Sequence, residues 1–134
     1  MQNLKGHIAL VTGASRGIGA AVALALAGAG AAVAVNYRER TGEADAVVGK
    51  IKARGGRAIA AAADVSQAVA VAKMVDQVTS ALGPIDILIN NAGIAIVRGV
   101  DDLTEAEFDQ TIAVNLKSAF LCTQAVLPAM RARK

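Results

Sequence analysis

Short apolar runs alternate with longer segments of helical periodicity along this chain. The apolar runs, each the length of a buried strand, occupy residues 7–12, 32–36, 57–63 and 85–90. Helical patterns cover residues 17–29, 41–54, 66–82 and a last region from 104 to 131. Strands that alternate with helices predict an α/β fold with a parallel sheet. Right-handed crossovers then give the strand order 3-2-1-4.

Polar residues mark where two of the predicted helices begin. Ser66 follows the third apolar run and is expected to cap the helix after it. Thr104 and Glu107 have the spacing of a capping box, in which each side chain bonds a backbone N–H of the other. These residues fix the expected starts of the third and last helical segments.

The first predicted strand leads into a loop that carries three glycines, and a helix follows at once. Gly13 would let the chain leave the strand through a tight turn, and Gly17 would leave its backbone open to a phosphate. Gly19 would let the helix lie close to the sheet. The unpaired N–H groups of the first helical turn would point at the anion. This order of strand, glycine loop and helix predicts a dinucleotide phosphate site, although the spacing G-x-x-x-G-x-G differs from the commoner G-x-G-x-x-G.

A second motif is expected to face this loop. Asn91-Ala92-Gly93 follows the fourth strand, which the order 3-2-1-4 places beside the first. The crossovers of these two strands run to opposite sides of the sheet, so their carboxyl ends would border a crevice. Both motifs are therefore predicted to converge on one cleft.

Four motifs in this chain resemble those of a known family. Thr-Gly-Ala-Ser-Arg-Gly-Ile-Gly at 12–19, Asp64-Val65, Asn90-Asn91-Ala92-Gly93 and Asn115 are similar in order and spacing to the short-chain dehydrogenases/reductases, nearest to the 3-oxoacyl-[acyl-carrier-protein] reductase branch. The resemblance implies a Rossmann-type doubly wound sheet and a nicotinamide dinucleotide cofactor. It extends from about residue 5 to the last residue and covers the first half of a family member.

The resemblance also implies which residues meet the cofactor. Those of the glycine loop are Gly13, Ser15, Arg16, Gly17, Ile18 and Gly19. Asp64 would accept a hydrogen bond from the adenine amino group, and Val65 would lie against the adenine ring. Taken by itself, Asp64 fits equally well as a turn residue at the entry of a helix. Asn91, Ala92 and Gly93 would lie beside ribose and nicotinamide.

Two other asparagines have expected roles. Asn115 is implied to distort its helix and to hold a water molecule of a proton relay, with an ordinary solvent-facing asparagine as the alternative. Asn90 is expected to tie the fourth strand to its neighbours.

The end of the second strand indicates which nicotinamide cofactor fits. NAD sites commonly carry Asp or Glu there, whereas this chain has Asn36, followed by Tyr37 and Arg38. The guanidinium groups of Arg16 and Arg38 would bind a 2′-phosphate that a carboxylate would repel. NADP(H) is therefore the predicted cofactor; the alternative is that both arginines are ordinary surface residues.

The family's general acid is not found in this sequence. The resemblance implies a tyrosine, a lysine four residues later and a serine, all after a fifth strand. Tyr37 is the only tyrosine and is followed by Thr41 at that spacing, and Ser118 lies inside a predicted helix. We expect one NADP-binding domain over residues 1–134 that lacks the catalytic half and does not by itself reduce a ketone. The substrate is not identified; a 3-oxoacyl thioester, a sugar, a steroid or a quinone would each suit the family.

Unburied apolar surface favours self-association. The fourth strand is apolar on both faces yet would lie at the sheet edge, and the last helix is apolar around most of its circumference. We expect copies to pair through these two elements, or the chain to be part of a longer polypeptide. A non-catalytic dinucleotide-binding module that works by association is the alternative function.

Composition restricts the other classes of partner. The net charge is +3, but the basic residues are scattered and aromatic residues are only 2%, so no nucleic-acid partner is expected. Residues 17–35 carry no charge, but their alanine and glycine content fits helix, turn and strand better than a membrane span. Cys122 is expected to be a buried small hydrophobe and His7 to be structural, and no metal site is predicted. The N-terminus has no secretory pattern, which predicts a cytoplasmic protein.

Overall fold

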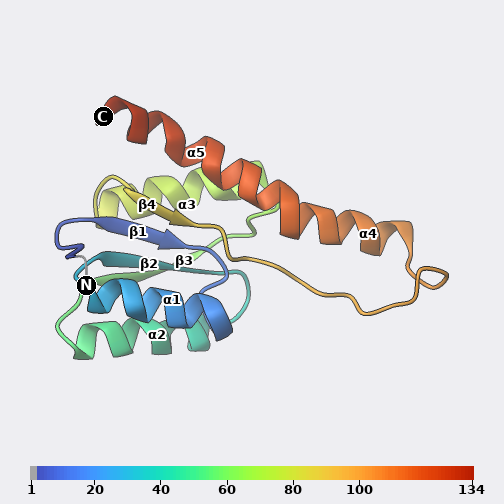
Figure 1. The fold of residues 1–134 in the computed structure, drawn as a ribbon, viewed down its shortest axis with the longest axis horizontal. Helices are drawn as coiled ribbons and strands as arrows, with labels where there is room; N and C mark the ends of the chain where they lie inside the picture. The colour runs from blue at the N-terminus through green and yellow to red at the C-terminus, as the bar shows by residue number, and fades with distance from the viewer. Residues whose placement is uncertain (1–2) are drawn as a thin grey trace.

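The computed structural model describes residues 3–134 and contains a single parallel sheet. Its strands are β1 (Ile8–Val11), β2 (Ala32–Tyr37), β3 (Ala58–Ala62) and β4 (Ile87–Ile89). They lie in the order β3-β2-β1-β4 (Figure 1), which confirms the predicted topology. Ala9 in β1 pairs with Val33 of β2 on one side and with Ile87 of β4 on the other.

Helices cover both faces of the sheet. They are α1 (Gly17–Gly28), α2 (Thr41–Ala53), α3 (Ala68–Ala81), α4 (Glu105–Ile112), a π-helical turn η1 (Ala113–Lys117) and α5 (Ser118–Ala132). In Figure 1, α1 and α2 lie below the sheet and α3 and α5 above it. Ala9 and Val11 of β1 pack in the core on the α1–α2 face, and Ile8 and Leu10 pack on the other. Because both faces of β1 are buried, its four residues form a continuous apolar run.

Several boundaries differ from the sequence prediction by one or a few residues. The strand at β2 extends one residue further, to Tyr37, and β4 is shorter than the apolar run 85–90. The side chain of Asn90 donates to Oγ1 of Thr123 in α5 at 3.2 Å, so it ties the end of β4 to a helix rather than to a strand. Ser66 is not the cap of α3; its hydroxyl donates to Asp64 instead, and Gln67 precedes the helix without a side-chain cap.

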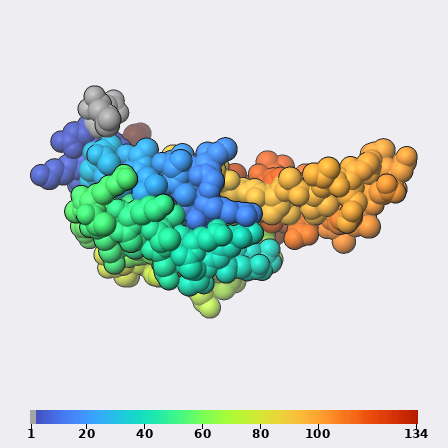
Figure 2. Space-filling view, turned by 90° about the horizontal axis from the view of Figure 1, so that it is seen from below, coloured from blue at the N-terminus to red at the C-terminus, as the bar shows by residue number. Residues whose placement is uncertain are grey.

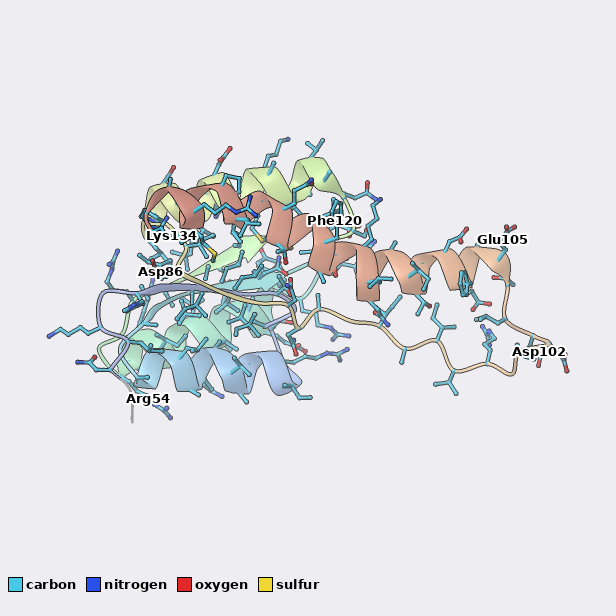
Figure 3. All side chains as sticks on the ribbon, turned by 45° about the horizontal axis from the view of Figure 1, so that its top comes forward. Arg54, Asp86, Asp102, Glu105, Phe120 and Lys134 are labelled. Atoms are coloured by element: carbon cyan, nitrogen blue, oxygen red, sulfur yellow. The ribbon has the colours of Figure 1, made fainter. Side chains whose placement is uncertain are left out.

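The last helix extends beyond the body of the molecule. Figures 1 and 2 show α4 and the segment before it projecting as an arm, and Figure 3 places Asp102 and Glu105 at its far end. The predicted capping box of Thr104 and Glu107 is present. Glu107 also pairs with Nε of Arg98 at 3.0 Å, which fastens the loop to the helix start.

The unbroken helix Glu105–Ala132 is long and apolar enough, by length and composition, to cross a membrane. Its Leu121, Cys122 and Val126 are buried in the core that also contains Met74 and Val78 of α3. The apolar composition of this half of the helix is therefore explained by its packing on the sheet and α3. The uncharged stretch 17–35 is divided among α1, a turn at Gly30 and β2.

Candidate functional site

The glycine loop leaves β1 by way of a residue that has no room for a side chain. Gly13 has φ +60°, and a Cβ there would lie 2.9 Å from Cα of Ala92. The two predicted motifs therefore touch at this point, because the backbone of one lies directly against the other. The cleft of the sequence prediction is observed between them.

The start of α1 offers free N–H groups to an anion. Gly17 has φ +59°, is exposed, and a Cβ there would meet nothing within 4 Å. Arg16 caps the helix without a side-chain hydrogen bond, and the first turn has no acidic residue. The first hydrogen bond of the helix is donated by the N–H of Ala20 to the carbonyl oxygen of Arg16. The N–H groups of residues 17–19 therefore have no partner within the helix. Backbone amides, open space and the positive helix end suit a phosphate.

Gly19 lies against the side chain of Asn91 and the backbone of Gly13, a closer contact than the predicted packing of the helix on the sheet. A Cβ at this position would lie 2.5 Å from Nδ2 of Asn91 and 2.5 Å from the carbonyl oxygen of Gly13. That same Nδ2 donates to the carbonyls of Thr12 and Gly13, each at 3.0 Å. Gly19 thus makes room for the amide that holds the loop, rather than simply bringing the helix close to the sheet.

Thr12 is a supporting residue that the sequence analysis missed. Its Oγ1 accepts from the backbone N–H of Asn91 and of Ala92, each at 3.0 Å, and the residue is buried. It joins the ends of β1 and β4 across the cleft. The available signal was a hydroxyl directly after a buried apolar strand, where its hydrogen bonds must be made within the protein.

Asn36 is buried and its side-chain amide is engaged within the protein. Oδ1 accepts from the N–H of Gly13 at 3.1 Å, and Nδ2 donates to the carbonyls of Ala61 and Ala63 at 3.1 and 3.3 Å. This amide links the ends of β1, β2 and β3. The observed role is support of the glycine loop, and a direct contact of Asn36 with a cofactor stays a prediction.

Arg38 and Asp64 face each other across the ends of β2 and β3. Nη2 of Arg38 lies 3.5 Å from Oδ2 of Asp64. The other carboxylate oxygen accepts from the N–H and hydroxyl of Ser66, at 3.0 and 2.6 Å. Partial burial raises the pKa of Asp64, but the Ser66 hydrogen bonds and the charge of Arg38 outweigh it and lower the pKa below its usual value. Asp64 is therefore a charged acceptor at neutral pH, and Arg38 is held at the rim.

A cavity of about 460 Å³ joins these parts. Its lining includes every predicted cofactor-binding residue except Gly19, which lies behind the loop. The predicted residues that line it are Gly13, Ser15, Arg16, Gly17, Ile18, Asn36, Tyr37, Arg38, Asp64, Val65, Asn91, Ala92 and Gly93. Lining residues absent from the prediction are Glu39, Arg40, Ala63, Ile94 and Val114. Segments from four loops thus form one concave site at the carboxyl ends of the strands.

The sequence of residues 7–134 matches the family model of the short chain dehydrogenases. The chain belongs to this family. An uncharacterized oxidoreductase of Methylorubrum extorquens is 47% identical over 125 residues, which are 93% of this chain and 50% of that protein. The 3-oxoacyl-[acyl-carrier-protein] reductase FabG of Staphylococcus epidermidis is 47% identical over 91% of this chain and 50% of its own length.

Solved structures agree with the fold. A short chain dehydrogenase from Burkholderia cenocepacia J2315, crystallised in complex with NADP, has a TM-score of 0.91 and 48% identity over 95% of this chain and 52% of its own. The chain thus spans about half the length of the curated relatives it matches.

Asn115 lies in the π-helical turn η1. Its Oδ1 accepts from the N–H of Ile94 at 2.7 Å, and its Nδ2 donates to the carbonyl of Ile94 at 2.9 Å. The expected distortion of the helix is therefore observed, and the amide clamps the segment after Gly93 to the helix. Ile94 itself and Val114, the residue before Asn115, line the cavity. A part for Asn115 in proton transfer stays a prediction.

Two other candidate nucleophiles, Ser118 and Cys122, do not line the cleft. The hydroxyl of Ser118 donates to the carbonyl of Val114 one turn earlier and is buried. Cys122 is fully buried, as predicted, and burial raises its pKa to about 11. Within residues 3–134, no three His, Cys, Asp or Glu side chains are grouped as a metal site would require.

Proposed function

We propose that this chain forms the dinucleotide-binding part of an NADP(H)-dependent oxidoreductase that reduces a ketone to an alcohol. The observation that supports this most directly is the contact of the two motifs: the open backbone at Gly17 and the Asn91–Gly93 segment line one cavity. A dinucleotide whose diphosphate rests on the amides of residues 17–19 would extend toward both walls of that cavity.

The charges at the rim favour the phosphorylated cofactor. Arg16 and Arg38 line the cavity, and Arg38 is already paired with Asp64. A 2′-phosphate would complete a bridge in which Arg38 contacts two anions, as a guanidinium with five donors can. The NADP complex of the Burkholderia relative supports the same choice.

The residues present suit binding and positioning rather than proton transfer. A bound NADPH would supply the hydride for carbonyl reduction. Asn91, Thr12 and Asn36 hold the loop that would bind it, and the amide of Asn115 fixes the segment at Ile94. The only tyrosine, Tyr37, lies at the end of β2 near Arg38. We infer that these 134 residues do not by themselves protonate a reduced carbonyl.

The substrate we propose is a 3-oxoacyl thioester. Support comes from the 47% identity to the Staphylococcus reductase of that name. We place the whole protein in the cytoplasm, where a soluble acyl carrier would be available.

NADPH and NADH titrations of the 134-residue chain, followed by fluorescence or calorimetry, test the cofactor proposal. NADPH should bind more tightly than NADH, and Arg38→Ala should reduce that preference about tenfold or more, the effect of losing a charge-assisted contact. Arg131→Ala removes the same charge from the exposed end of α5 and should leave the preference unchanged. Equal loss of preference in both variants, or no effect of Arg38→Ala, would contradict the proposal.

A non-catalytic dinucleotide-binding module that associates with its own copies is the second candidate. Two features support association: within the described residues 3–134, β4 pairs with β1 alone, so one side of its ladder is open there, and its three residues are half-buried. The long helix also exposes large apolar side chains, among them Leu116 at 64% and Phe120 at 60%. Tight NADPH binding by a self-associated chain without ketone reduction would favour this candidate.

A further inference from the structure

A second concavity lies at the end of the sheet opposite the dinucleotide cleft. It is a groove of about 720 Å³, bordered by the starts of β1 and β2 and by the ends of α1 and α2. In Figure 1 the N-terminus lies beside the starts of the strands, and the strand arrows point to the opposite end of the sheet. The proposed function makes no use of this groove.

The groove carries positive charge without matching carboxylates. Lys5, Arg54 and Arg57 line it together with His7, and its lining includes no Asp or Glu. Among the described residues 3–134, the ion pairs all involve other cations. Three permanent cations are thus left to a partner from solution.

Nearby negative groups are too few to neutralise these cations. The carboxylate of Asp86 accepts from the N–H of Ile8 at the groove wall, but Asp86 is already paired with Arg133. The carboxyl ends of α1 and α2 each add about half a negative charge. The three positive charges therefore exceed the negative charge of the two helix ends by about two elementary charges. The groove thus favours an anion.

A smaller slot, with both apolar and polar walls, adjoins the charged groove. A cavity of about 250 Å³ between α1 and α2 is lined by Leu24 and Ile51 and shares Ala27, Gly28, Arg54 and Gly56 with the groove. The backbone of Gly28 is open: a Cβ there would meet nothing within 4 Å. A ligand held at Arg54 could therefore place an apolar group between the two helices.

We propose that this groove binds a small amphiphilic anion. Its phosphate or carboxylate head would contact Arg54, Arg57 and Lys5, and a short hydrocarbon part would enter the slot between Leu24 and Ile51. Guanidinium groups bind such planar or tetrahedral anions through paired, charge-assisted hydrogen bonds. Burial of the hydrocarbon in the slot supplies the remaining affinity, so neither a bare anion nor a neutral alcohol satisfies the whole site.

The test is an NMR titration of the isotope-labelled 134-residue chain with hexyl phosphate. Inorganic phosphate and hexanol serve as head-only and tail-only probes. We expect hexyl phosphate to shift the amides of Gly28, Gly55 and Gly56 and to bind more tightly than either partial probe. Equal affinity for inorganic phosphate and hexyl phosphate would overturn the proposal, as would shifts confined to residues 13–19.

Charge variants complete the test. Arg54→Gln with Arg57→Gln should weaken hexyl phosphate binding about tenfold, the effect of losing charge-assisted contacts. Lys73→Gln with Lys117→Gln removes the same charge from exposed positions on α3 and η1 and should change nothing. Loss of binding in both double variants, or in neither, would refute a specific groove. Because the groove does not include the glycine loop, this result is independent of whether NADPH binds.

Discussion

Asp86 and Arg133 join the start of β4 to the end of α5: Nη2 of Arg133 lies 2.9 Å from Oδ1 of Asp86. The same nitrogen donates to the carbonyl of Ile85 at 2.9 Å, and the second oxygen of Asp86 accepts from the N–H of Ile8 at 2.8 Å. Figure 3 shows Asp86 close to the C-terminal Lys134. One carboxylate therefore connects β1, β4 and the last helix on the edge away from the cleft.

The first prediction concerns the pH dependence of this connection. Partial burial raises the pKa of Asp86, but bonds from Ile8 and Arg133 outweigh it and hold the pKa below its ordinary value of 3.8. The stabilisation is therefore complete above pH 3.8, the ordinary pKa that applies to the unfolded state. It is lost as the pH falls through the lower pKa of Asp86 in the folded state. Asp86→Asn should lower the free energy of unfolding at pH 7 by about 1 kcal/mol, a value reduced for solvent screening.

Urea unfolding at pH 7 and at about pH 3 checks this prediction, since the gap between the two proteins should narrow in acid. Asp76→Asn, on the exposed side of α3, is the control and should leave the free energy of unfolding unchanged at both pH values. A gap of the same size at both pH values would show that the charge of Asp86 does not stabilise the fold.

The second prediction concerns the space behind the glycine loop. Gly19→Ala would bring a Cβ to 2.5 Å from Nδ2 of Asn91, so the amide that bonds Thr12 and Gly13 must move. We expect a loss of about 1–3 kcal/mol in the free energy of unfolding together with weaker NADPH binding. Gly49→Ala, in α2 with nothing within 4 Å, should instead be neutral or stabilising by up to about 1 kcal/mol. Equal thermal stability of the two variants would contradict the crowding argument.

The third prediction concerns the clamp between Asn115 and Ile94. Asn115→Ala removes the acceptor of the Ile94 N–H, so the exchange of that amide hydrogen should become much faster. Asn115→Asp keeps an oxygen acceptor and should preserve most of the protection. Gln110→Ala, an exposed change on α4, is the control and should leave exchange at Ile94 unaffected. If exchange at Ile94 is the same in all four proteins, the hydrogen bond does not hold this segment in solution.

Local patterns predicted the glycine loop and the capping box, because each depends on neighbours in sequence, and the handedness of the crossovers predicted the strand order. The contacts that shape the cleft could not be read in this way. Thr12 and Asn36 carry buried hydrogen-bonding groups whose partners lie 79 and 25 residues away, and only the folded sheet brings them together. Ser66 failed as a helix cap for a different, local reason: its hydroxyl donates to the charged carboxylate of Asp64, two residues earlier. The basic groove joins residues from three turns, and no single motif marks it.

The last prediction concerns the exposed apolar stripe of the long helix, made of Phe108, Ile112, Leu116 and Phe120. On an α-helix, side chains four residues apart are rotated by about 40° from one another around the helix axis. The wider π-turn η1 partly cancels that drift, so the four side chains stay near one face. Their exposed fractions are 52%, 40%, 64% and 60%, and we predict that a second copy of the chain covers this apolar face.

Charges placed within this stripe should therefore prevent association. Leu116→Glu with Phe120→Glu should shift the chain from dimer or larger toward monomer in sedimentation velocity runs, because two carboxylates would have to be buried without partners. Val69→Glu puts a charge at a residue that is 69% exposed at the start of α3, away from the stripe, and should leave the association state unchanged. A wild-type chain that sediments as a monomer at all concentrations would refute the role of the stripe, as would a double variant that associates as strongly as wild type.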